Sequence, residues 1–391
     1  MSDALSSRRQ QQLVLSESLD LDCVIVDILS RLPAKSLLRF RCVCKAWRAL
    51  ISDPYFIRKH LSCINTKIST SYSLLIKDDI FRSAEYEAIL KCLSRGGPLP
   101  SRRLDFPVLD PSFDIATIGI VGSCNGLICL VRDIVARESF TFMLWNPCTG
   151  ESQVLPQPPL HSSQQYFLGF GYDSTTDDYK VILGSYRSGH EFVVVFTLKS
   201  GSWRKLERLN RYFEVHWGGC LVNEALHWVL DELEDGRLIA SKMVSFDLAE
   251  EKFHEIPFPF PPNPVDRREL IARVGILNNC LTLYFQTMGH RVGCNFKMWV
   301  LKDNGVKESW TEVINIPSEV MGQGKEYTCI SCISDNGEIL MQPEVVGPLA
   351  LYNPREKTYG IVMDYYDYMH ETATYIETFV SPLTGITSAS S

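Results

Sequence analysis

Five aromatic residues recur at nearly constant intervals through most of this 391-residue chain. Trp145, Phe196, Phe246, Trp299 and Tyr352 are separated by 51, 50, 53 and 53 residues. Each lies in a short apolar run that precedes a turn and a second strand-like run, as in L-W-N-P-C-T-G-E-S and S-F-D-L-A-E-E-K-F. A unit of about 50 residues cannot bury both of its faces alone, so successive copies must pack on one another. The spacing therefore predicts a repeat architecture.

A second turn precedes each aromatic residue by 16 to 23 positions. These turns are Asn125-Gly126, Asp177-Asp178, Asn223-Glu224, Asn278-Asn279 and Asn336-Gly337. Such pairs favour the tight hairpin turns that match the twist of β-strands. Each repeat then holds two hairpins, or four strands, which is the content of a kelch-type propeller blade.

The repeats predict a mainly β fold, a kelch-like β-propeller of about six blades over residues 72–385. Five blades are clear, Tyr72–Val108 resembles a sixth with a poorer pattern, and five or seven blades remain open. We expect almost no helix in this region. A strand near Thr374–Val380 is expected to pair with the first blade and close the ring. The terminal S-P-L-T-G-I-T-S-A-S-S segment is expected to be loose, with a tail at 386–391.

The N-terminal region has helical rather than strand periodicity. Residues 1–16 are polar and expected to be disordered, 17–62 to be helical, and 63–71 to form a linker. Val43, Trp47, Leu50 and Ile51 recur at the spacing of one helix face, and Pro33 separates them from a similar stripe at Val24–Leu32. So short an apolar module either needs a partner protein or packs on the rest of the chain, and the residues alone leave both open.

The charge of this module is opposite to that of the whole chain. Residues 31–60 hold eight basic residues and one acid, whereas the formal net charge of the chain is −7. A basic helical module can bind nucleic acid or an acidic protein surface. Because the basic residues alternate with an apolar stripe, we expect a protein partner and no nucleic acid.

Other function classes leave no trace in the sequence. The N-terminus M-S-D-A-L-S-S-R-R-Q-Q-Q lacks an apolar segment, and no membrane helix is expected, which favours a cytoplasmic or nuclear protein with reduced cysteines. No nucleophile-elbow, zinc-protease, phosphate-loop or kinase motif occurs, and Cys329 and Cys332 form a C-x-x-C without a second pair. We therefore expect no catalysis, cofactor, metal site or membrane partner. Trp145, Trp203, Trp299 and Trp310 are interpreted as packing residues between blades.

Two stretches resemble known families. I-L-S-R-L-P-A-K-S-L-L-R-F-R-C-V-C-K-A-W-R-A-L-I-S-D-P-Y-F, within Asp22–Phe56, resembles a plant F-box. G-S-C-N-G-L-I-C-L, L-W-N-P-C-T-G and G-F-G-Y-D-S-T-T-D-D-Y-K-V resemble the F-box associated domain of plant F-box proteins over roughly residues 70–385.

The F-box resemblance implies docking on a Skp-type adaptor of a cullin ubiquitin ligase. The candidate core and adaptor-face residues that it implies are Leu32, Pro33, Leu37, Leu38, Val43, Cys44, Trp47, Leu50 and Ile51. The whole chain then resembles a substrate-recognition subunit that holds a target protein on its propeller for ubiquitination and degradation. The target and its binding residues cannot be read from the sequence. A propeller enzyme, a sugar- or metabolite-binding protein and a non-ubiquitinating scaffold are the alternatives.

Overall fold

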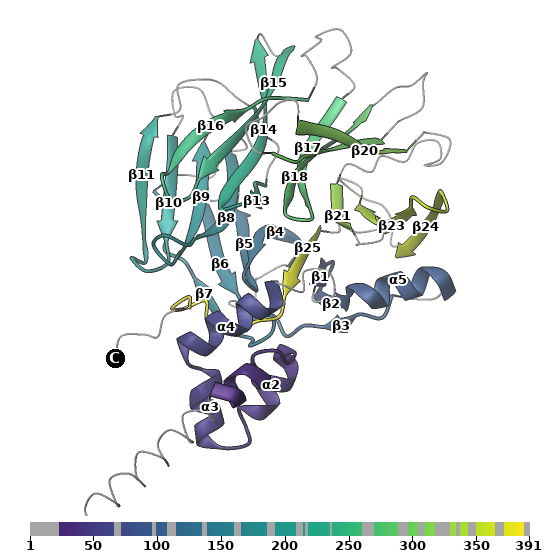
Figure 1. The fold of residues 1–391 in the computed structure, drawn as a ribbon. Helices are drawn as coiled ribbons and strands as arrows, with labels where there is room; N and C mark the ends of the chain where they lie inside the picture. Colours follow the sequence, from purple (N-terminus) through teal and green to yellow (C-terminus); the bar gives the residue numbers. More distant parts are fainter. Residues whose placement is uncertain are drawn as a thin grey trace, which may run out of the picture.

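The computed structural model shows a small helical module beneath a ring of antiparallel sheets (Figure 1). The structure describes residues 23–65, 72–95, 99–107, 115–134, 139–159, 166–185, 192–208, 214–215, 218–234, 237–259, 270–287, 296–303, 309–316, 329–333, 337–342, 349–363 and 371–386. The disorder expected for residues 1–16 lies outside these ranges. Within them, no helix is long and apolar enough to cross a membrane.

The helical module comprises residues 23–29, α2 (Ala34–Phe40), α3 (Lys45–Ile51) and α4 (Pro54–Asn65). Pro33 is the N-cap of α2, and Pro54 is the first residue of α4, where its missing N–H costs no helical hydrogen bond. Helix α3 ends at Ile51 and α4 begins at Pro54, so Asp53-Pro54 separates the two helices. The expected linker at 63–71 is wrong for 63–65, which are the last turn of α4.

Six sheets form the blades of a propeller, which confirms the expected six-blade architecture. The first blade is β25 (Glu371–Ile376), β1 (Tyr72–Lys77), β2 (Phe81–Glu85) and β3 (Arg102–Arg103). The second is β4 (Ile118–Cys124), β5 (Leu127–Ile134), β6 (Ser139–Trp145) and β7 (Ser152–Val154). The third is β8 (Tyr166–Asp173), β9 (Asp178–Ser185), β10 (Phe192–Thr197) and β11 (Ser202–Arg208).

The other three blades follow the same antiparallel order. The fourth is β12 (Glu214–Val215) and β13 (Cys220–Val222), both paired with β14 (Ala225–Glu234), then β15 (Arg237–Asp247) and β16 (Lys252–Ile256). The fifth is β17 (Leu270–Leu277), β18 (Cys280–Thr287), β19 (Phe296–Leu301) and β20 (Trp310–Ile316). The sixth is β21 (Cys329–Ile333), β22 (Ile339–Gln342), β23 (Leu349–Asn353) and β24 (Thr358–Met363).

The C-terminal strand closes the ring. β25 pairs with β1 over six residues, from Tyr72 opposite Ile376 to Lys77 opposite Glu371. The inner strands contact one another in the order β25, β4, β8, β13, β17, β21 and back to β25. The predicted closing strand is confirmed, although it begins at Glu371 rather than Thr374. The first blade is thus built from both ends of the propeller sequence.

Backbone conformation at the predicted turns explains their residue types. Both central residues have positive φ at Asn125-Gly126, Asn223-Glu224 and Asn278-Asn279, as type I′ hairpin turns require. Asp177 and Gly337 also have positive φ, and Asn336 lies outside the described residues.

The repeated aromatic residues occupy one structural position in five blades. Trp145, Phe196, Phe246, Trp299 and Tyr352 all lie on the strand third from the axis. Trp145, Phe196 and Phe246 are fully buried. The indole of Trp145 packs at 5.3 Å from Phe81 of the first blade, ring centre to ring centre, and so joins two blades. This contact confirms the packing role between blades that was predicted for Trp145.

Two parts of the propeller region differ from expectation. The helix α5 (Tyr86–Arg95) follows β2 and packs against β24 of the sixth blade, where almost no helix was expected. The expected loose end is wrong for residues 381–386, because Ser381 and Gly385 form a β-bridge and Ile386 is buried in the main core. Gly385 reverses the chain there with φ of 69°.

Candidate functional site

The helical module buries several apolar side chains. Leu37, Ile51 and Phe56 are fully buried, and Leu29 and Ala34 nearly so. The Phe40 and Trp47 rings meet edge to face, with centres 5.3 Å apart, beside these side chains. The Cys44 thiol caps α3 by accepting the backbone N–H of Trp47 at 3.4 Å. The buried residues and the cap therefore hold the side chains on the outer surface of the module in defined positions.

The outer surface of the module exposes large apolar side chains that ordinary folding would bury. The exposed fractions are 65% at Val43, 64% at Tyr55, 58% at Ile28 and 52% at Val24. Val43 was expected to share the helical face of Trp47, Leu50 and Ile51, and this expectation is wrong. It precedes the N-cap Cys44 and lies in the turn between α2 and α3. The turn therefore directs an apolar side chain to solvent.

A basic groove of about 580 Å³ lies beside this turn. Leu38, Arg41, Cys42, Cys44, Lys45 and Arg48 line it. None of the three cations forms an ion pair with another described residue. An apolar turn next to unpaired cations suits a protein surface that is both apolar and acidic.

The nine predicted site residues fall into three groups. Leu37 and Ile51 are fully buried. Leu32, Leu38, Trp47 and Leu50 are half-buried, and Pro33, Val43 and Cys44 are exposed. The structure thus divides the set into residues that hold the module together and residues that can meet a partner.

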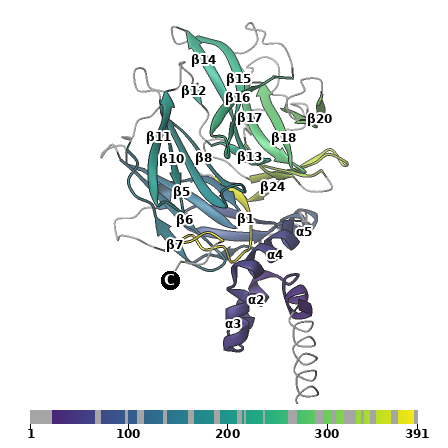
Figure 2. The same cartoon turned by 60° about the vertical axis from the view of Figure 1, so that its left-hand side comes forward.

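Helix α4 joins the module to the propeller through one continuous core. Both views place α4 nearest the blades (Figures 1 and 2). His60 is fully buried, and its ring lies 5.4 Å from that of Phe379, just after β25. Phe56, Ile57 and Leu61 share this core with blade residues such as Leu127 and Tyr179. The sequence left open whether a partner protein or the rest of the chain covers the apolar faces of the module. For α4, the structure shows that the propeller covers them.

Burial changes the ionisation of His60. Its Nε2 lies 3.0 Å from the carbonyl oxygen of Leu32. Loss of hydration lowers the pKa of His60 below its ordinary value, and the backbone hydrogen bond opposes this effect only in part. The ring is neutral at pH 7 and serves as a packing residue of the junction.

Ion pairs surround the apolar junction. Arg58 Nη2 lies 2.9 Å from Asp177 Oδ2, and Lys35 Nζ lies 3.0 Å from Glu377 Oε1. Burial raises the pKa of Asp177, but hydrogen bonds from Tyr172 and Arg58 outweigh it and the net pKa is lowered. Asp177 therefore stays ionised and ties α4 to the turn between β8 and β9.

Comparison with protein families identifies both parts of the chain. The model of the F-box associated beta propeller domain matches residues 109–377, and that of the F-box domain matches residues 18–59. The chain belongs to the F-box protein family. The F-box thus corresponds to the helical module, and the exposed turn at Val43 lies within it.

Plant proteins match most of the chain. The "F-box/kelch-repeat protein At3g23880" of Arabidopsis thaliana is 28% identical over 91% of this chain and 94% of its own length. The "F-box protein CPR1" of the same plant is 31% identical over 75% of this chain and 72% of its own length. Among solved structures, TolB from Acinetobacter baumannii aligns at 9% identity, with a TM-score of 0.47 over 82% of this chain and 72% of that one. Together the F-box and the propeller support, in general terms, a substrate-recognition role in a Skp–cullin–F-box ligase.

The sequence did not identify the groove and junction residues, because they do not follow the apolar spacing of the helices. Arg41, Cys42, Lys45 and Arg48 were absent from the predicted set, yet they line the groove beside Val43. The excess of basic residues in 31–60 was the signal that could have found them. His60 of the junction left no such signal. Among the described residues, no group of three or more His, Cys, Asp or Glu side chains could hold a metal ion.

Proposed function

We propose that this F-box protein binds a Skp-type adaptor through the outer face of its F-box and a target protein through its propeller. The chain itself performs no bond chemistry in this role. It promotes ubiquitination in the cytoplasm or nucleus by raising the effective concentration of the target near the conjugating enzyme of the cullin complex.

The exposed Val43 turn beside the basic groove is the observation that carries the adaptor assignment. An apolar side chain that is 65% exposed and adjacent to three unpaired cations has no structural role within the described chain. An acidic partner surface with an apolar centre would satisfy both features, and its binding would weaken as salt screens the charges.

The junction supports a rigid link between adaptor and target. Because α4 belongs to the same hydrophobic core as the second and third blades, the F-box has a fixed orientation on the propeller. A target bound to the propeller would then be held at a defined position relative to the adaptor.

The test replaces Val43 with a carboxylate. Val43→Asp should change the free energy of unfolding by less than about 0.5 kcal/mol relative to wild type, since the side chain is exposed. It should weaken adaptor binding at least tenfold, because a buried unpaired charge costs several kcal/mol and each 1.4 kcal/mol is tenfold in affinity. Biolayer interferometry with immobilised adaptor measures the change.

The matched control is Val313→Asp, since Val313 is 44% exposed on β20, away from the F-box. It should bind the adaptor as the wild type does. A double change of Leu32 and Pro33 to Ala, which the sequence alone suggests, is less specific. Both residues line a cavity of about 410 Å³ at the junction with Glu85 and Glu377. Equal binding by Val43→Asp and wild type would refute the assignment.

A propeller enzyme is the competing function. It needs carboxylates or a metal where the blades converge, and the described residues that line the central cavity include no Asp, Glu, His, Lys or Arg. Co-purification distinguishes a ligase subunit from a scaffold that does not promote ubiquitination. A ligase subunit recovers cullin together with the adaptor, whereas a scaffold recovers the adaptor alone.

A further inference from the structure

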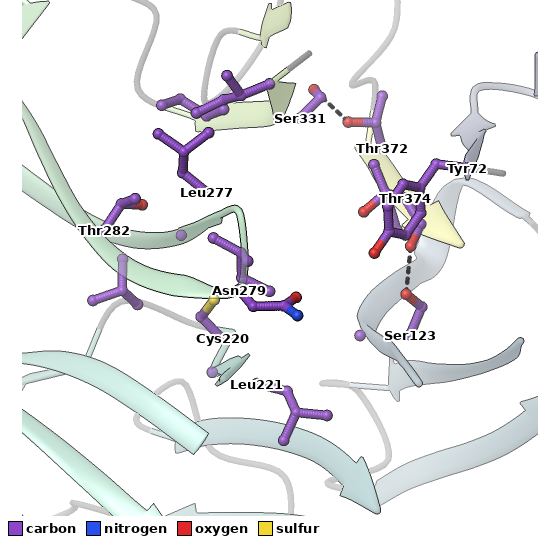
Figure 3. Close-up of a pocket in the computed structure, with 18 of the residues that line it drawn as sticks. Tyr72, Ser123, Cys220, Leu221, Leu277, Asn279, Thr282, Ser331, Thr372 and Thr374 are labelled. Carbon is purple, nitrogen blue, oxygen red and sulfur yellow. Dashed lines mark hydrogen bonds between the residues drawn. The ribbon is translucent and has the colours of Figure 1, made fainter. Parts of the chain in front are cut away.

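The centre of the propeller contains a cavity of about 370 Å³. All six inner strands contribute to its wall, from Ser123 on β4 to Thr374 on β25, and the turn at Asn278-Asn279 lies at its edge. Its volume falls in the range of small-molecule sites. Figure 3 shows the side chains that surround it.

The wall has two chemically different sides. Hydroxyl groups of Ser123, Ser331, Thr372 and Thr374 gather on one side. Across from the two threonines lie the apolar Leu221 and Leu277, with the amide of Asn279 between them and Thr282 on the side of Leu277 (Figure 3). Thr372 Oγ1 lies 2.6 Å from Ser331 Oγ, so β25 and β21 present their hydroxyls together. No charged side chain is among the lining residues that the structure describes. A ligand that matches this wall is uncharged. It bears hydroxyl groups on one face and, on the other, an apolar ring with a polar substituent.

Thr282 supplies an unused hydrogen-bonding group in the cavity wall. Its side chain is 1% exposed, and its Oγ1 has no hydrogen-bond partner. A buried hydroxyl without a partner destabilises a fold by about 1–3 kcal/mol. The group is therefore costly unless something in the cavity binds it.

Gly275 lies directly beside this hydroxyl. It is the cross-strand partner of Thr282 and also lines the cavity. A Cβ at position 275 would lie 3.0 Å from Thr282 Oγ1 and 3.1 Å from the Tyr284 ring, tighter than ordinary contact. With glycine there, Thr282 on the second strand reaches the cavity past the inner strand.

We propose that this central cavity is a binding site for a small uncharged molecule with an apolar ring and a hydroxyl-bearing face, such as a neutral glycoside. The hydroxyls of β25 and β21 hydrogen-bond its polar face from one side, and Leu221 and Leu277 cover its ring from the other. Thr282, on the side of Leu277, hydrogen-bonds a polar substituent of the ring. The site is separate from the F-box surface and stands whether or not the adaptor proposal holds.

The experiment uses the full chain and two probes that differ only in charge. Phenyl β-D-glucopyranoside is neutral, and phenyl β-D-glucuronide carries a carboxylate that the uncharged wall cannot pair. Saturation-transfer NMR and calorimetry should detect the neutral probe and show at least tenfold weaker binding of the glucuronide, because an unpaired charge would lose its hydration. No binding of the neutral probe, or equal binding of the two, overturns the proposal.

Two threonine variants locate the binding. Thr282→Val keeps the side-chain shape and removes the unpartnered hydroxyl. It should weaken binding of the neutral probe about fivefold, and the free protein should be no less stable than wild type. Thr378→Val is the matched control, since Thr378 is equally buried but donates its hydroxyl to Asn125 O at 2.7 Å. It should lower stability and leave probe binding unchanged. Unchanged probe affinity in Thr282→Val would overturn the assignment of this residue to the site.

Discussion

Replacing Phe379 with Ala tests whether the F-box and the propeller unfold as one unit. Phe379 is 5% exposed and packs on the ring of His60 within the core that both parts share. Truncating a buried phenylalanine costs about 3–5 kcal/mol, as lost transfer energy and a residual cavity. If the core is continuous, this loss should lower the stability of both parts together.

The assay is urea unfolding of the full chain, followed by far-ultraviolet circular dichroism at helix- and strand-sensitive wavelengths. Wild type and Phe379→Ala should each give one coincident transition, with the midpoint of the variant shifted by the expected energy divided by the m-value. Leu383→Ala is the control, because Leu383 is close in sequence but 56% exposed, and it should change stability by less than about 0.5 kcal/mol. Two separate transitions, with the strand signal unaffected by Phe379→Ala, would refute the shared core.

Two further measurements probe the ring closure and the buried histidines. Gly126→Ala should destabilise the chain more than Gly150→Ala in urea unfolding. Both glycines have positive φ, but a Cβ at 126 would lie 2.8 Å from Ile376 O, whereas nothing lies within 4 Å of one at 150. Burial lowers the pKa of His60 and His227, so the unfolded chain binds more protons below pH 6.5. The melting temperature should therefore be steady above pH 6.5 and fall as the pH drops below it, and a flat profile would contradict this reasoning.

Local patterns in the sequence determined the architecture. The spacing of Trp145, Phe196 and Phe246 and turns such as Asn125-Gly126 predict four-strand blades, because hairpins depend on residues close together in the chain. The same holds for the F-box helices, whose caps and apolar spacing are short-range features. The helix α5 was missed because its short amphipathic pattern lies between strands of one blade.

Only the tertiary structure decided which residues meet across long separations. His60 packs on Phe379, and Thr282 lies opposite Gly275, yet neither relation leaves a periodic trace in the sequence. Periodicity also failed at Val43, which a turn directs outward although its spacing matches Trp47 and Ile51. Local propensity shapes each hairpin and helix, but the burial of a side chain depends on every element packed around it. For that reason the sequence determined the blades and the F-box, whereas the tertiary structure decided the shared core, the exposed turn and the uncharged central cavity.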